Sequence, residues 1–236
     1  MEDYWDIRSD SYVLGVTDLR EEEASVWRRC LSGRVAALRS ALDVGTGAGF
    51  LSIILEGLGL EVTGIDLSRG MISHGTRISR MKGADISFLQ GDAEQLPFRP
   101  RSFDLVASRH LLWTLPDPAG ALEEWLRVLR PGGRMLAIDG TWFDPAPSRR
   151  IRRWVASLVS SSKPVEFKRF YGEIEGDLPL FRTASPQRYV DLFEEAGLAR
   201  VSLDRLEEVN RFYRGHASLS YRLANSDASF MVIGER

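Results

Sequence analysis

The sequence contains a single cysteine, Cys30, so no disulfide can form within the chain, and we expect a reducing compartment. No apolar run approaches the roughly 20 residues that cross a bilayer. The first residues, Met-Glu-Asp-Tyr-Trp-Asp, are acidic and lack the apolar core of a signal peptide. The 31 basic and 33 acidic residues leave a formal net charge of −2, which offers no overall attraction for nucleic acid or an anionic membrane. These absences predict a cytoplasmic protein without nucleic-acid or membrane partners.

The sequence does contain a glycine turn between two apolar segments, within residues 40–68. A short apolar run, Ala-Leu-Asp-Val, predicts a buried parallel strand that stops where Gly-x-Gly-x-Gly begins, at residues 45–49. Apolar residues then recur at helical spacing from Phe50 to Leu58, and a second apolar strand over residues 61–65 ends at Asp66. Glycine has no Cβ and readily adopts positive φ, so a ligand can lie directly against the backbone of such a turn.

The acid that ends the second strand predicts a nucleoside ligand, because Asp66 can accept hydrogen bonds from both ribose hydroxyls. Phe50 stands where the fingerprint for a dinucleotide needs a third glycine. Asp43 lies just before the turn, where its carboxylate would repel a pyrophosphate but attract an ammonium and a sulfonium. The pattern therefore favours S-adenosylmethionine over NAD, and it disfavours an NAD-dependent oxidoreductase.

Three motifs together resemble those of the class I S-adenosylmethionine-dependent methyltransferases. They are Leu-Asp-Val-Gly-Thr-Gly-Ala-Gly at residues 42–49, Gly-Ile-Asp-Leu-Ser at 64–68 and Gly-Asp-Ala-Glu-Gln-Leu-Pro-Phe at 91–98. The likeness is greatest to the small-molecule branch that includes the ubiquinone and menaquinone enzymes. It covers residues 4–140 closely and the C-terminal part only in outline. It implies in-line transfer of a methyl group to a small organic acceptor, with S-adenosylhomocysteine as the second product.

The fold implied by this resemblance is a single α/β domain, a doubly wound, mostly parallel, seven-stranded Rossmann-like sheet with an inserted cap region. We expect four segments: an N-terminal helical flap (1–39), a cofactor-binding core (40–140), a cap over the substrate (141–185), and a C-terminal helix with an edge hairpin (186–236). Helices are predicted at 21–38, with Val26, Trp27, Cys30 and Leu31 inward, at 69–81 and 186–196 with N-caps Ser68 and Ser185, and at 120–129. Further strands are predicted at 85–90, 103–108 and 134–139, and an antiparallel pair at 199–206 and 230–234.

The resemblance assigns the adenine to Asp92 and the Ala93 amide, and the aminoacyl end to Asp43, the glycine turn and the Arg109 carbonyl. The Arg109 guanidinium itself would repel a sulfonium. The expected cofactor-binding residues are Tyr12, Asp43, Gly45, Thr46, Gly47, Gly49, Asp66, Leu67, Ser68, Met71, Asp92, Ala93, Glu94, Ser108 and Arg109. Met71 could equally be ordinary core.

The N-terminal segment places Trp5, Arg8 and Tyr12 at i, i+3 and i+7, on one face of a helical turn. This spacing predicts a flap over the cofactor in which Tyr12 or Arg8 reaches the methionine end. The alternative is an aromatic cluster that packs on the core.

Residues after the fourth strand fall where ligands bind in doubly wound sheets. His110 titrates near neutrality and could take a proton from the acceptor, although it could equally be a packing or positioning residue, because methyl transfer from a sulfonium often needs no base. Trp113, Asp139 and Trp142 are expected to line the acceptor pocket, with helix core as the alternative for Trp113. No metal site is expected, because Asp139 and Asp144 lack a third ligand and suit solvated loop acids.

Two further function classes remain as alternatives. A nucleic-acid methyltransferase is disfavoured by the net charge and by the lack of an Asn/Asp-Pro-Pro-Tyr/Phe motif after the fourth strand. No feature of the sequence requires the second alternative, a non-catalytic module that binds the same cofactor. The residues therefore favour an enzyme with a small-molecule acceptor.

Overall fold

The computed structural model describes Asp6 and residues 21–141, 175–181, 185–216 and 229–236. Tyr12, Trp142 and Asp144 lie outside this part of the chain, as do Trp5 and Arg8. Most of the expected flap and cap also lies outside it. The assignments of those residues therefore stay predictions.

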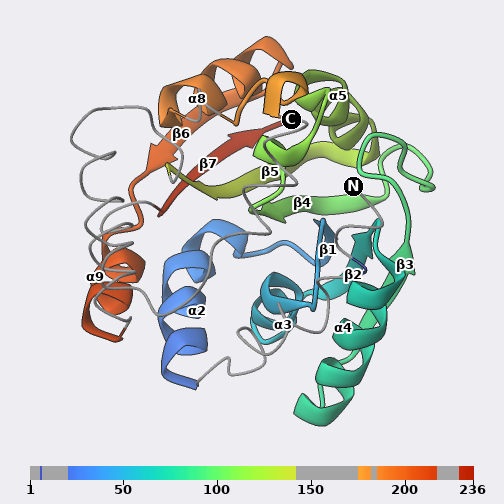
Figure 1. Cartoon of the computed structure of the whole chain (residues 1–236), viewed down its shortest axis with the longest axis vertical. Coiled ribbons are helices and arrows are strands. Elements are labelled where there is room, and N and C mark those ends of the chain that lie inside the picture. The colour runs from blue at the N-terminus through green and yellow to red at the C-terminus, as the bar shows by residue number, and fades with distance from the viewer. Residues whose placement is uncertain (1–5, 7–20, 142–174, 182–184, 217–228) are drawn as a thin grey trace.

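The centre of the fold is one seven-stranded sheet, in the order β3-β2-β1-β4-β5-β7-β6 (Figure 1). Its strands are β1 Ser40–Val44, β2 Glu61–Asp66, β3 Ile86–Gln90, β4 Phe103–Arg109, β5 Leu129–Gly140, β6 Ala199–Asp204 and β7 Ser229–Glu235. The first five strands pair in parallel, whereas β7 runs antiparallel between β5 and β6. The strand order reverses between β1 and β4, so the carboxyl ends of these two strands form the switch point where ligands bind in such sheets. The predicted doubly wound, mostly parallel sheet is confirmed.

Helices cover both faces of the sheet (Figure 1). They are α2 Glu21–Val35, α3 Phe50–Glu56, α4 Arg69–Lys82, α5 Pro118–Val128, α8 Pro186–Glu195 and α9 Glu207–His216, with short 3₁₀ turns η1 Leu112–Thr114 and η2 Glu175–Asp177. One hydrophobic core lies between the sheet and α5 and α8, with Trp125, Tyr189 and Phe193 at its centre. A second core lies on the other face, where α2, α3 and α9 pack around Trp27 and Leu31. None of the helices in the described ranges is both long and apolar enough to cross a membrane.

Most predicted helix ends are confirmed by their caps. The Ser68 hydroxyl accepts from the Met71 N–H at 3.1 Å at the start of α4. The Ser185 hydroxyl caps α8 in the same way, with Pro186 in its first turn. Helix α5 begins at Pro118, two residues before the predicted start, because the Asp117 carboxylate provides the cap. Helix α2 ends at Val35, three residues before its predicted end.

Two regions differ from the prediction. Strand β5 begins at Leu129, five residues before the predicted start at Arg134. The extra residues form a bulge, since Phe103 pairs with Leu129 while Leu105 pairs with Arg134. The link before β7, for which no helix was predicted, contains α9, which packs on α2. Cys30 of α2, expected to face inward, is only half-buried.

Candidate functional site

The glycine turn between β1 and α3 follows the predicted geometry. Gly45, Gly47 and Gly49 have φ of +67°, +55° and +85°, which glycine adopts without strain. The Thr46 N–H donates to the Ile65 carbonyl at 3.0 Å and so ties the turn to β2. A Cβ at Gly45 would come within 2.8 Å of the Leu111 side chain, whereas a Cβ at Gly47 would meet nothing within 4 Å. The turn is therefore packed behind Gly45 and open at Gly47.

Asp43 lies beneath this turn and is 1 % exposed. Its Oδ2 accepts hydrogen bonds from the hydroxyls of Thr46 at 2.8 Å and Ser52 at 2.6 Å. Its Oδ1 is buried and has no hydrogen-bond partner among the described residues. Burial raises the pKa of Asp43 to about 6, against the hydrogen bonds from Ser52 and Thr46. One carboxylate oxygen thus holds the turn, and the other is left for a donor or a cation.

Asp66 lies at the carboxyl end of β2, where its two oxygens join separate loops. Oδ2 accepts from the Gly47 N–H at 2.8 Å, and Oδ1 accepts from the Ser68 N–H at 2.9 Å. Burial raises the pKa of this carboxyl group, although both backbone hydrogen bonds oppose the shift. Carboxylate oxygens have two lone pairs each, so Asp66 can still accept from a diol.

Asp6 is a residue of this site that the sequence reasoning missed. Its Oδ1 accepts from the Ser68 hydroxyl and from the Gly70 N–H, the latter at 2.9 Å. These hydrogen bonds lower the pKa of Asp6. An acid is favourable at the amino end of a helix, here α4. Asp6 thus contacts Ser68, which follows Asp66 by two residues, and no local sequence pattern pointed to this contact between distant segments.

The loop after β3 carries the acid expected at the adenine. Asp92 is exposed, and its Oδ1 accepts from the Glu94 N–H at 2.9 Å. The Ala93 carbonyl accepts from the indole N–H of Trp125 at 2.9 Å. Glu94 in turn accepts from the Asp117 N–H at 2.9 Å. Helix α5 and its N-cap residue Asp117 therefore hold this loop, and the Asp92 carboxylate lies at the surface.

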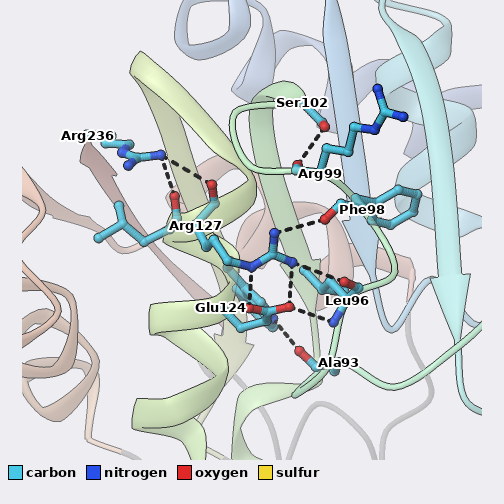
Figure 2. Close-up of polar contacts among 10 residues, drawn as sticks. Ala93, Leu96, Phe98, Arg99, Ser102, Glu124, Arg127 and Arg236 are labelled. Atoms are coloured by element: carbon cyan, nitrogen blue, oxygen red, sulfur yellow. Dashed lines mark hydrogen bonds and ion pairs between the residues drawn. The ribbon is translucent and has the colours of Figure 1, made fainter.

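A second set of contacts holds the following part of the same loop (Figure 2). Arg127 donates to the carbonyls of Phe98 at 2.9 Å and Leu96 at 3.1 Å, and its Nε lies 2.6 Å from Oε2 of Glu124. Glu124 also accepts from the Leu96 N–H at 2.9 Å. Sequence reasoning did not find this clamp, because only the i, i+3 spacing of Glu124 and Arg127 hinted at a pair and nothing local pointed to the loop.

Replacing Arg127 by methionine is expected to lower the free energy of unfolding by about 1–3 kcal/mol, because two loop carbonyls and Glu124 lose a charged donor. The amides of residues 91–98 should exchange hydrogen faster than in the wild type. Urea denaturation and hydrogen exchange measure the two effects. Arg99→Met, at an exposed arginine of the same loop, is the control. Equal protection of residues 91–98 in both variants would contradict the clamp.

The end of β4 carries an arginine whose side chain lies on aromatic rings. The Arg109 guanidinium lies 4.0 Å from the ring centre of Phe50 and 5.8 Å from that of Trp27. Its Nε is buried and has no hydrogen-bond partner among the described residues. Ser108 beside it is 1 % exposed. The guanidinium therefore points toward α2 and α3, and the role expected of the Arg109 carbonyl stays a prediction.

The acceptor side of the sheet holds three polar residues. His110 has φ of +61°, and its Nδ1 lies 3.8 Å from Asp139 Oδ1. Asp139 Oδ2 accepts from the Tyr189 hydroxyl at 2.9 Å, and Oδ1 accepts from the Gly140 N–H at 3.0 Å. The expectation of a solvated loop acid was wrong for Asp139, which is 1 % exposed. It lies within β5 between β4 and β7, and Tyr189 of α8 provides the donor that burial requires.

Trp113 and Met71, each given two interpretations above, are both buried. Trp113 is 6 % exposed in η1 and lies 5.7 Å, centre to centre, from the Phe181 ring. Met71 is 2 % exposed in the first turn of α4. Leu67 beside it is 36 % exposed. Packing accounts for Trp113 and Met71, and their ligand contacts stay predictions.

The described residues contain no group of three or more His, Cys, Asp or Glu side chains arranged to hold a metal ion.

The doubly wound sheet, the open glycine turn after β1, the acid at the end of β2 and the acidic loop after β3 are the features that the resemblance to class I methyltransferases predicted. Residues 42–137 match the family described as the methyltransferase domain. These residues are thus similar to a methyltransferase domain.

Relatives agree with this assignment. The demethylmenaquinone methyltransferase of Renibacterium salmoninarum is 38% identical over 115 residues, which are 48% of this chain and 47% of the relative. The chain thus spans about half the length of the curated relatives it matches.

Solved structures share the fold at low identity. A SAM-dependent methyltransferase from Aquifex aeolicus aligns with a TM-score of 0.61 at 18% identity, covering 95% of this chain and 96% of that one. Geranyl diphosphate C-methyltransferase from Streptomyces coelicolor aligns with a TM-score of 0.64 at 17% identity, covering 90% and 79%. These likenesses establish the fold.

Proposed function

We propose that the protein is an S-adenosylmethionine-dependent methyltransferase that acts on a small organic acceptor. The observation that carries the proposal is the pair of carboxylates, Asp43 and Asp66, on either side of a glycine turn that is open at Gly47. Such a surface suits a ligand with a diol and a positively charged end. It does not suit a diphosphate, whose negative charges both carboxylates would repel.

Two features of the structure fit this cofactor. The buried Oδ1 of Asp43 has no hydrogen-bond partner among the described residues, so an ammonium nearby would satisfy it. The space over Gly47, where a Cβ would meet nothing within 4 Å, leaves room for the ligand against the backbone.

The roles proposed for individual residues come from the sequence motifs and from the resemblance to class I methyltransferases. Asp66 would hold the ribose, Asp92 with the Ala93 amide the adenine, and Asp43 with the Arg109 carbonyl the aminoacyl end. The other contacts that we expect are with Tyr12, Gly45, Thr46, Gly47, Gly49, Leu67, Ser68, Met71, Glu94 and Ser108. When bound, S-adenosylmethionine supplies a methyl group on a sulfonium. The chain aligns the acceptor and excludes water, and alignment alone can be worth an effective concentration of roughly 10⁵ M or more.

The nature of the acceptor is also a proposal. The names of the similar proteins above specify demethylmenaquinone and geranyl diphosphate as acceptors, which are small organic molecules with apolar bodies. Trp113 and Trp142 are our candidates for the wall of the acceptor pocket, whereas the carboxylate of Asp139, expected there from the sequence, is buried. The single cysteine supports a cytoplasmic location, and the net charge of −2 supports an acceptor other than nucleic acid.

The decisive experiment has two parts. Calorimetry compares the binding of S-adenosylhomocysteine with that of NAD, and we expect binding of the first alone. A metabolite extract is then incubated with isotopically labelled S-adenosylmethionine, and the labelled product of the wild type is compared with that of Asp66→Ala. Preferred binding of NAD would overturn the proposal in favour of an oxidoreductase. Full cofactor affinity without any labelled product would favour a non-catalytic module. Label in RNA, together with a salt-dependent affinity of the protein for RNA, would favour a nucleic-acid methyltransferase.

A further inference from the structure

Aromatic rings hold the guanidinium of Arg109, the last residue of β4, in one place. Its central carbon lies 4.0 Å from the centre of the Phe50 ring and 5.8 Å from that of Trp27. Both rings are packed in the core, since Phe50 is 8 % exposed and Trp27 is 1 % exposed. Phe50 is also the first residue of α3, directly after the glycine turn. The charge of Arg109 is therefore fixed beside this turn, at the switch point of the sheet.

The donors of this guanidinium have no acceptor among the described residues. Stacking on a ring engages the flat face of a guanidinium and leaves the N–H groups along its edge for other partners. Nε is buried without a partner. The two terminal nitrogens also form no hydrogen bond or ion pair within the described ranges, yet they are not among the buried unpartnered atoms, so solvent reaches them. Two open, coplanar donors of this kind fit the two oxygens of a carboxylate.

The acids nearest to Arg109 already have donors of their own. Burial raises the pKa of Asp139 to about 7 and also raises the pKa of Tyr213, and the charge of Arg109 opposes both shifts. Asp139 accepts from the Tyr189 hydroxyl at 2.9 Å. Glu23 accepts from the Tyr213 hydroxyl. These hydrogen bonds satisfy the two acids, so the carboxylate that suits Arg109 is one that a ligand brings.

We propose that the terminal nitrogens of Arg109 recognise the carboxylate of an acidic methyl acceptor. This role rests on the proposed function, and it adds the substrate class, a small organic acid. Arg109 supplies one positive charge, whereas three acids, Asp43, Asp66 and Asp139, lie toward the carboxyl ends of their strands. A monoanion suits this balance better than a doubly charged phosphate. A bound acid also neutralises the guanidinium, which otherwise opposes the binding of a sulfonium.

In this role Arg109 determines specificity and takes no part in bond making. The carboxylate oxygens that pair with the guanidinium have their lone pairs engaged, so they are poor nucleophiles. The methylated atom therefore lies elsewhere in the acceptor, and the product keeps its carboxylate. An electron pair of that atom forms the bond to the methyl carbon, and the pair of the cleaved carbon–sulfur bond stays on sulfur. A proton carried by the methylated atom passes to solvent.

Calorimetry with benzoate tests this role on the full chain saturated with S-adenosylhomocysteine. Arg109→Met keeps an apolar side chain on Phe50 but removes both donors, so benzoate should bind about 10-fold more weakly or worse. Arg109→Lys keeps the charge without the planar pair of donors and should restore only part of the affinity. Benzamide, which is neutral, should bind all three proteins equally. Unchanged affinity for S-adenosylhomocysteine shows that each variant is folded.

The matched control is Arg211→Met, which removes an exposed arginine of α9 and should bind benzoate like the wild type. In the extract assay, an anion exchanger should retain the labelled product at neutral pH, and Arg109→Met should yield less of it. Equal benzoate affinity in the wild type and Arg109→Met, tighter binding of inorganic phosphate than of benzoate, or a neutral labelled product would each overturn the proposal.

Cofactor binding separates the remaining explanations. If Arg109→Met lost affinity for S-adenosylhomocysteine but not for 5′-methylthioadenosine, the guanidinium would hold the carboxylate of the cofactor, and the proposal for the acceptor would be wrong. A wild type that bound no S-adenosylhomocysteine would contradict the proposed function. Retained binding of S-adenosylhomocysteine with equal benzoate affinities would overturn only the role of Arg109.

Discussion

Replacing Asp66 by alanine is expected to weaken the binding of S-adenosylhomocysteine by about 100-fold or more. Each hydrogen bond from a ribose hydroxyl to this carboxylate is worth about 1.5–3 kcal/mol, so losing two removes a factor of at least that size. The same change frees the N–H groups of Gly47 and Ser68, which Asp66 now holds at 2.8 Å and 2.9 Å. The ligand therefore loses both its partner and the preformed shape of the turn. Titration calorimetry measures the affinity.

Two further variants make this result specific to the Asp66 carboxylate. Asp66→Asn keeps the size of the side chain but replaces one acceptor oxygen by a donor, so it should lose most of the same affinity. Asp85→Ala removes an exposed acid just before β3, away from the carboxyl ends of the strands, and should bind like the wild type. A loss of less than about fivefold in Asp66→Ala would show that this acid does not hold the ribose.

The cofactor side of the molecule could be predicted from sequence because its signals are local. The strand before Gly45, the glycine turn and the acid at position 66 lie within one stretch of chain, and each has a pattern of its own. The cap at Ser68 was equally local, since a serine before a helix needs only the N–H groups of the next turn.

The acceptor side depends on contacts between distant segments, which no local pattern specifies. Asp139 is buried because β7 and α8, both from the last fifty or so residues, pack against β5. Its partner Tyr189 is separated from it by fifty residues. Position 139, at the end of a strand, was compatible with a solvated acid until those segments were placed. Helix α9, in contrast, had a local signal that was missed, since Val209, Phe212 and Tyr213 recur at helical spacing in the helix that packs on α2.

Replacing Asp43 by asparagine should reduce the affinity for S-adenosylhomocysteine by about 10- to 100-fold, and it should leave that for 5′-methylthioadenosine nearly unchanged. The first ligand has an ammonium group and the second lacks the amino-acid part. A single charge pair near a protein surface is worth up to about 4 kcal/mol at 4 Å, and part of that is offset by desolvation. Calorimetry with the two ligands separates the charge of Asp43 from its structural role, because both ligands need an intact turn.

The pH dependence gives an independent check. The pKa of Asp43 is raised by burial to about 6, so wild-type affinity for S-adenosylhomocysteine should rise between pH 5 and 7 as the carboxylate ionises. Asp43→Asn should show no such rise. Equal losses for both ligands, or a pH dependence that persists in the variant, would place the cationic end of the ligand elsewhere.

Stability should change in the opposite direction to affinity. Because the folded-state pKa of Asp43 lies above the unfolded value of 3.8, the stabilisation from this group is complete below pH 4 and is lost as pH rises through about 6. Asp43→Asn removes the cost of the buried charge, so its gain in unfolding free energy should be larger at pH 8 than at pH 5. Asp104→Asn, near the amino end of β4 and away from the carboxyl ends of the strands, is the control. Burial tends to raise the pKa of Asp104, but hydrogen bonds from Arg130, Ser40 and Arg39 outweigh it and lower the value to about 2. That variant should lose stability at neutral pH and keep its affinity. A buried acid that weakens the fold yet strengthens ligand binding is what a cation site requires, and urea denaturation at the two pH values distinguishes it from an acid that only supports the turn.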